Sequence, residues 1–130
     1  MKKLKIVNSL ACEYVARGSY GKHTLVNAYA GDIRVRSFPA TFPVAFYAEV
    51  IPPKSIRQDI KFTVFQGRKK RAEAMASFEF EEGKVAVLSL PPFKFTFAES
   101  SKIRVIASGE HFAQTVLLEK MVQAGEFPET

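Results

Sequence analysis

Hydrophobic residues occupy every second position in several short runs of this chain, and glycine, proline or polar turns bound the runs. The stretch IKFTVFQ places Ile60, Phe62 and Val64 on one face, and FKFTF, residues 93–97, alternates phenylalanine with polar residues. Side chains of an extended backbone point alternately to two faces, so this period predicts half-buried β-strands. About eight or nine such runs occur at a spacing of roughly 8 to 12 residues. The pattern predicts an all-β fold: a single antiparallel β-sandwich of about eight or nine short strands, with a partly open β-barrel as the alternative.

The length of the chain sets the number of domains. A chain of 130 residues can bury one continuous core without disulfides or metal ions. We therefore expect one domain over residues 1–130, with residues 123–130 (QAGEFPET) as a frayed tail. Hydrophobic residues make up 47% of the chain, yet no apolar run approaches the roughly 18 residues of a membrane-spanning helix. The composition therefore predicts a globular protein without a membrane span.

The first residues, KKLKIVNSLACEY (2–14), have the outline of a bacterial export signal, because two lysines precede an apolar stretch and a cysteine. A secretory leader needs an unbroken apolar core of roughly 7 to 15 residues, and Lys5, Asn8 and Ser9 interrupt this one. With period two, the same residues predict a strand in which one face carries Leu4, Ile6, Asn8, Leu10, Cys12 and Tyr14. A single cysteine forms no internal disulfide, so we expect a cytoplasmic protein.

Turn residues predict the connections in the first half of the chain. Gly31-Asp32 predicts a tight turn that joins strands at residues 23–30 and 33–38 into a hairpin. The two prolines of PATFP, residues 39–43, predict a crossing between sheets or a course along an edge. The stretch PPKSIRQD, residues 52–59, predicts the longest polar loop.

The second half of the chain continues with short strands. Prolines 91 and 92 separate two predicted strands, VAVLSL and FKFTF. Residues 111–121 are compatible with a strand or a short helix, and we favour the strand. The residues that we expect in the core are Leu10, Cys12, Phe46, Phe62, Val64, Phe78, Val87 and Val105.

Few residues of this chain suggest catalysis. Cys12 shares its predicted face with Leu10, which favours a buried, inert thiol over a reactive one. The histidines are His23 and His111, and nothing in their spacing brings either to Cys12. Adjacent Glu110 and His111 would point to opposite faces of a strand, which disfavours a metal site. We therefore expect a non-catalytic protein without a cofactor or metal, and a cysteine-dependent enzyme remains an alternative.

The sharpest charged feature is the basic run RKKR at residues 68–71, between two predicted strands. Four cations at a hairpin tip would project into solvent and could hold phosphates, with Phe65 available to stack on a base. The formal net charge of +6 agrees with a polyanion partner, although lysine and arginine at a tip also keep a hairpin soluble. Both interpretations stay open. The candidate polyanion contacts are Arg68, Lys69, Lys70, Arg71, Arg34 and Arg36.

Short features follow one another in residues 11–40. They are Cys12, Gly21-Lys22, Thr24-Leu25 and Phe38-Pro39. In this order they resemble the opening of a family of short bacterial proteins of unknown function. The resemblance implies a single β-sandwich domain of immunoglobulin-like or C2-like architecture. It implies no activity and no catalytic residues.

Three functional hypotheses follow from these observations. The favoured one is a non-catalytic protein-binding or adaptor module, which offers sheet edges and loops to another protein or to its own copy. The second is nucleic-acid or polyanion binding through residues 68–71. The third is an enzyme that uses Cys12 with His23 or His111. We expect no membrane partner.

Overall fold

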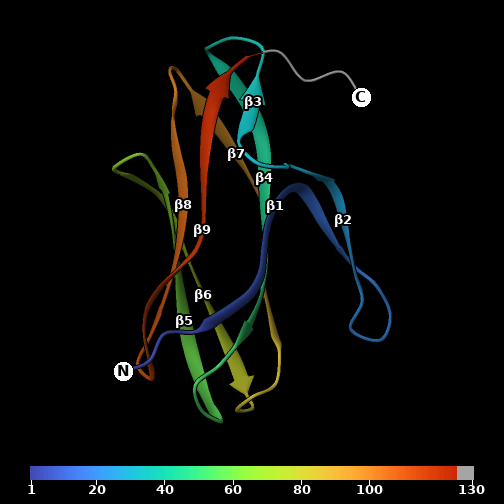
Figure 1. Cartoon of the computed structure of the whole chain (residues 1–130), viewed down its shortest axis with the longest axis vertical. Coiled ribbons are helices and arrows are strands. Elements are labelled where there is room, and N and C mark those ends of the chain that lie inside the picture. The colour runs from blue at the N-terminus through green and yellow to red at the C-terminus, as the bar shows by residue number, and fades with distance from the viewer. Residues whose placement is uncertain (126–130) are drawn as a thin grey trace.

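The computed structural model describes residues 1–125, which form two layers of β-strands (Figure 1). These residues contain nine strands: β1 (Lys5–Arg17), β2 (His23–Ala28), β3 (Ile33–Val35), β4 (Ala40–Ile51), β5 (Ile56–Gln66), β6 (Lys69–Phe80), β7 (Ala86–Phe97), β8 (Ser101–Gly109) and β9 (Phe112–Ala124). One sheet has the order β2-β1-β4-β7 and the other has the order β3-β9-β8-β5-β6. The fold is therefore the predicted β-sandwich and not the barrel alternative. Within the described residues, no helix is long and apolar enough to cross a bilayer.

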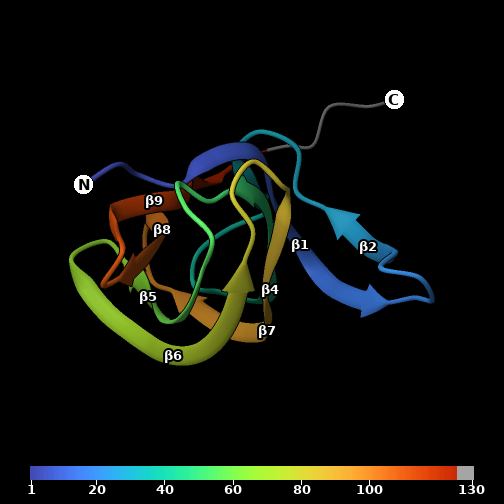
Figure 2. The same cartoon turned by 90° about the horizontal axis from the view of Figure 1, so that it is seen from below.

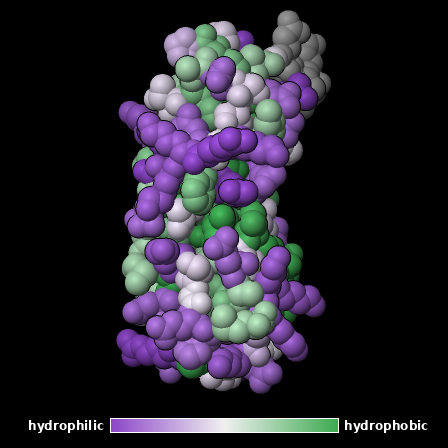
Figure 3. Space-filling model, turned by 90° about the vertical axis from the view of Figure 1, so that its left-hand side faces the viewer, coloured by the Kyte–Doolittle hydropathy of each residue, from purple (hydrophilic) through white to green (hydrophobic). Residues whose placement is uncertain are grey.

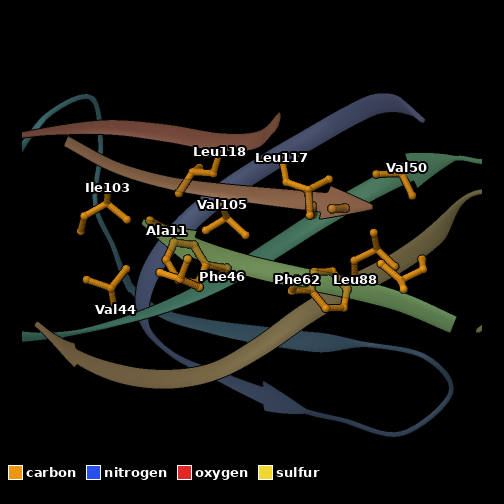
Figure 4. Packing of buried hydrophobic residues seen from close by; sticks show 14 of the residues in the cluster. Ala11, Val44, Phe46, Val50, Phe62, Leu88, Ile103, Val105, Leu117 and Leu118 are labelled. Atoms are coloured by element: carbon orange, nitrogen blue, oxygen red, sulfur yellow. The ribbon is translucent and has the colours of Figure 1, made fainter. Parts of the chain in front are cut away.

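The core lies between the two sheets and takes side chains from both (Figure 4). Phe46 and Phe62 come from facing sheets and are buried together with Val105 and Leu118. Their alternation along the strands is the pattern seen in the sequence, since every second residue of a strand points inward. Of the predicted core residues, the structure buries Cys12, Phe46, Phe62, Val64 and Val105, and it leaves Leu10, Phe78 and Val87 half-buried.

Strand β1 changes the face that it buries part-way along its length. The pairing of β1 with β4 shifts register between Ile6 and Asn8, where the strand contains an irregularity. Such a bulge reverses the alternation of side chains beyond it. Beyond the bulge, Ala11 is buried and Tyr14 is exposed, and Cys12 is buried as well. The prediction of a single buried face from Leu4 to Tyr14 is therefore wrong.

The turn at Gly31-Asp32 does not close a hairpin. Strand β2 pairs with β1, whereas β3 lies in the other sheet and pairs in parallel with β9, with Ile33 opposite Val122. Both of these side chains are buried, so burial of Ile33 in the core between the sheets stabilises the short β3 at this position. The predicted hairpin of residues 23–30 and 33–38 is wrong, because local alternation does not specify a partner strand.

The last segment of the chain is a strand, as favoured, and it is longer than predicted. Strand β9 continues to Ala124, and the backbone N–H of Gly125 donates a hydrogen bond to the carbonyl oxygen of Val35 at 2.9 Å. Residues 123–125 therefore hold β3 in place, and the prediction of a frayed tail is wrong for them. The rest of that predicted tail, residues 126–130, lies outside the described residues.

Prolines lie at edges and crossings of the sheets. Pro91 and Pro92 are exposed within β7, which is an edge strand, so the two predicted strands VAVLSL and FKFTF are one. The pairing of β7 with β4 shifts register between Leu90 and Phe93, and an edge strand tolerates proline at such an irregularity. The chain crosses from one sheet to the other between β3 and β4, as PATFP predicts, although β4 already begins at Ala40. The polar loop predicted at 52–59 is shorter, because β5 begins at Ile56.

The hairpin of β1 and β2 extends away from the body of the sandwich (Figure 2). Strand β1 pairs with β4 up to Cys12 and with β2 from Cys12 to Arg17, so its outer half belongs to the hairpin alone. The ring of His23 packs on Tyr47 with centroids 5.4 Å apart. The opposite edge strands, β6 and β7, lie at another rim of the molecule, where the candidate site is found.

Candidate functional site

The basic run does not form one four-residue tip. Gly67 and Arg68 make the turn between β5 and β6, and Lys69 is already the first residue of β6. Gly67 has φ of +60°, and its N–H donates a hydrogen bond to the carbonyl oxygen of Lys102 at 2.8 Å. This bond ties the turn to β8. Among the four cations, Arg68 alone therefore lies in the turn.

A β-bulge separates Arg71 from its neighbours in the run. Val64 pairs with Ala72 and Phe65 pairs with Lys70, so Arg71 is the extra residue without a direct partner on β5. A bulge redirects the side chain that it carries. The guanidinium carbon of Arg71 lies 6.0 Å from the centroid of the Phe93 ring on β7, and Arg71 Nε is buried without a hydrogen-bond partner. Arg71 thus reaches across the gap between the two sheets.

Lys70 points to the outer face of the sheet and is already paired. Its Nζ lies 2.8 Å from Glu73 Oε1, and the Nζ of Lys61 lies 3.9 Å from the same oxygen. The hydrogen bond from Lys70 lowers the pKa of the Glu73 carboxyl. In contrast, Arg68 and Lys69 have no ion-pair partner among residues 1–125. The four cations therefore differ in what they can offer to a ligand.

A basic hollow of about 470 Å³ lies at this end of the gap, with Arg68, Lys69 and Arg71 in its wall. Gln66 Nε2 donates a hydrogen bond to the carbonyl oxygen of Thr96 at 2.9 Å, while Gln66 Oε1 is buried without a partner. The hollow therefore combines three cationic side chains with an unused acceptor. The other residues in its wall are Gln66, Gly67, Thr96, Ala98, Glu99 and Ser101.

An apolar hollow of about 110 Å³ lies next to the basic hollow, on the other side of Arg71 and Phe93. Its volume is that of about four water molecules, enough for one apolar side chain. Glu73 lies in its wall. The apolar residues of its wall are Phe46, Phe62, Val64, Ala72 and Ala74, together with Leu90, Pro91, Pro92 and Phe93 of β7.

The two hollows follow the gap between β6 and β7, each of which is an edge strand of its own sheet. Each of these strands hydrogen-bonds to one neighbour only, so one row of backbone N–H and C=O groups on each has no sheet partner among the described residues. The side of the molecule next to the β5–β6 turn is mostly hydrophilic, with hydrophobic residues gathered near its middle (Figure 3). Sequence reasoning missed the apolar hollow, although the paired prolines were a signal for an edge.

Other predicted contacts lie apart from the two hollows. Arg34 and Arg36 are exposed in and after β3, at the opposite edge of the five-stranded sheet from β6. Four strand spacings separate the two edges, which is about 19 Å. The guanidinium of Arg104 covers the ring of Phe65, with its central carbon 5.4 Å from the centroid. The ring face predicted to stack on a base is therefore occupied on that side.

The residues considered for catalysis are not brought together. Cys12 is fully buried, its Sγ lies 3.4 Å from the carbonyl oxygen of Tyr14, and burial raises the pKa of its thiol. His23 pairs with Arg17, five positions along β1 from Cys12, and His111 lies in the β8–β9 turn of the other sheet. Glu110 and His111 share that turn, with His111 Nε2 4.0 Å from Glu110 Oε2. The described residues contain no group of three or more ligands that could hold a metal ion.

No protein-family model matches this chain, and no curated protein matches it. The resemblance of residues 11–40 to a family of short bacterial proteins therefore stays a prediction. The geometry of the gap between β6 and β7 is what carries the functional argument.

Proposed function

We propose that the protein is a non-catalytic binding module that holds an extended segment of a partner protein in the gap between β6 and β7. The apolar hollow between two sheet-edge strands is the observation that carries this proposal. An extended segment that lies along β6 would pair with its open backbone groups, and pockets beside an edge select the side chains of such a segment.

The chemistry of the two hollows defines the segment that would fit. One apolar side chain fits the hollow lined by Ala72, Ala74 and Leu90. The neighbouring hollow holds Arg68, Lys69 and Arg71 and suits a carboxylate or another anionic group. A segment with an apolar residue and an acidic residue a few positions away satisfies both. Burial of the apolar side chain supplies affinity, and the charge supplies orientation.

A peptide-display selection against the whole chain tests this proposal. The selection should enrich peptides that carry an apolar residue close to acidic residues. Ala74→Arg places a long side chain at the rim of the apolar hollow and should abolish their binding. Val116→Arg, at an exposed apolar position on β9, is the matched control and should leave binding intact. Selected peptides that bind the Ala74→Arg variant as well as the native chain would refute the site.

Polyanion binding through the basic hollow is the second candidate function. Its supporting observation is that Arg68 and Lys69 have no ion-pair partner among residues 1–125 and face the same hollow as Arg71. It predicts that a single-stranded oligonucleotide binds with an affinity that falls steeply with salt. Arg68→Gln together with Lys69→Gln should remove that binding. Binding that is absent, or insensitive to salt, would eliminate this candidate.

A further inference from the structure

Strand β6 has opposite charges at its two ends. Arg68, Lys69 and Arg71 lie at its beginning, and Glu79 and Glu82 lie at its end. Charges can prevent two copies of an edge strand from pairing when like charges would lie opposite each other in the pair. Here two copies of β6 laid antiparallel would instead bring the basic end of each to the acidic end of the other. The charge order therefore favours pairing of β6 with itself.

The centre of β6 is also unusual for an exposed edge. Met75 lies midway between the two charged ends and is 67% exposed on the outer face of the sheet. A two-fold axis through Met75 would place this side chain against the same residue of the second copy. Residues of an antiparallel pair that lie opposite each other point to the same face. The two methionines would then cover one another on the outer face.

The same two-fold pairing brings apolar residues together on the inner face, where the ring of Phe78 packs on Phe62 and Phe80 of its own chain. With Met75 on the axis, Ala72 lies opposite residue 78 of the other strand, which is the half-buried Phe78. Ala72 is part of the wall of the apolar hollow, so Phe78 from the second copy would lie beside that hollow. Facing positions that alternate large and small residues allow side chains to interdigitate.

From these three features, we infer that β6 pairs antiparallel with β6 of a second copy of this chain. This inference rests on the proposed function, because it names the partner of the same edge. The second copy brings an apolar side chain beside the apolar hollow and carboxylates towards the basic one. The dimer would join two five-stranded sheets edge to edge, with the same surface used on both copies. A single strand pair buries less area than a standard protein interface, so we expect a weak, reversible dimer.

Disulfide trapping tests the register of this pairing in the full chain. Residues on the axis lie opposite themselves, with Cα atoms about 4.5–5.5 Å apart, which is within reach of a disulfide. Met75→Cys should therefore cross-link rapidly when oxidised glutathione is added, and the buried Cys12 should not compete. Glu73→Cys alone is the matched control, because its two copies would lie about 14 Å apart. Cross-linking of Met75→Cys no faster than of Glu73→Cys would overturn the inference.

Charge exchange tests the same pairing without a covalent bond. Sedimentation equilibrium of the native chain should give a dimer that weakens with added salt. Arg68→Glu with Lys69→Glu, and separately Glu79→Lys with Glu82→Lys, should each weaken self-association roughly tenfold or more. An equimolar mixture of these two variants should restore a dimer, because their ends are complementary. Failure of the mixture to associate would overturn the inference.

These results also separate the inference from the proposed function. A native chain that stays monomeric up to submillimolar concentration overturns β6 self-pairing. If selected peptides still bind that monomer and are blocked by Ala74→Arg, the proposed function stands with another protein as the partner. If the dimer forms and displaces the peptides, both hold. If neither peptide nor second copy binds the edge, both fail.

Discussion

Replacing Gly67 by alanine adds one methyl group and directly tests the backbone conformation of the β5–β6 turn and its contact with Ser101. The φ of Gly67 is +60°, and a Cβ at this position would lie 2.8 Å from Ser101 Oγ. The left-handed backbone costs an L-residue roughly 1–2 kcal/mol. Moving Ser101 away from a preferred rotamer adds about 0.5–1.5 kcal/mol. We therefore expect Gly67→Ala to lower the free energy of unfolding by about 1.5–3.5 kcal/mol.

Urea unfolding followed by circular dichroism measures this loss. Each kcal/mol lost from the free energy of unfolding lowers Tm by about 4 °C for a chain of 130 residues. Gly83→Ala is the control, because Gly83 has φ of +76° and no heavy atom within 4 Å of an added Cβ. Gly83→Ala should lose only the stability that the left-handed backbone costs. Adding Ser101→Ala to the Gly67→Ala variant should restore only the stability lost through the steric contact. Equal losses in the two glycine variants, without recovery by Ser101→Ala, would refute the reasoning.

Two further predictions concern ionisable groups whose pKa is raised by partial or full burial. Burial raises the pKa of the Cys12 thiol, so iodoacetamide should modify this thiol only after unfolding. Mass spectrometry of chains treated with and without urea measures the modification, and rapid modification of the folded chain would contradict the prediction. Burial first, then the carboxylate of Glu13 and then Cys12, raises the pKa of Tyr29 from 10.0 to about 12. The folded state therefore keeps a proton on Tyr29 that the unfolded chain loses, so the contribution of Tyr29 to stability is unchanged below pH 10.0 and falls as the pH rises from 10.0 to about 12. Tyr29→Phe should remove this part of the slope of urea midpoint against pH, and an unchanged slope would contradict the assignment.

The alternation of side chains predicts much of this fold because a half-buried strand imposes period two on its own residues. Ile60, Phe62 and Val64 are buried together as predicted, since nothing interrupts β5 between them. Bulges are where the same reasoning fails. An irregularity between Ile6 and Asn8 exchanges the faces of β1, because one residue of slip reverses every later side chain.

The candidate site was only partly predictable. The basic run at 68–71 stands out in the sequence by charge alone. Its separation into an outward, paired Lys70 and an Arg71 that covers Phe93 depends on a bulge opposite Val64 and Phe65. Neither the bulge nor the contact leaves a local signal, because Phe93 belongs to a strand in the other sheet.

The sequence by itself determined that this chain forms strands, where most of them turn, and which end of β6 is basic and which acidic. These properties follow from neighbouring residues along one strand. Only the tertiary structure decided that β3 joins β9, that β6 and β7 become facing edges, and that two hollows open between them. Those outcomes depend on which distant strands bury their apolar faces together, and that choice is made by packing across the core of the sandwich.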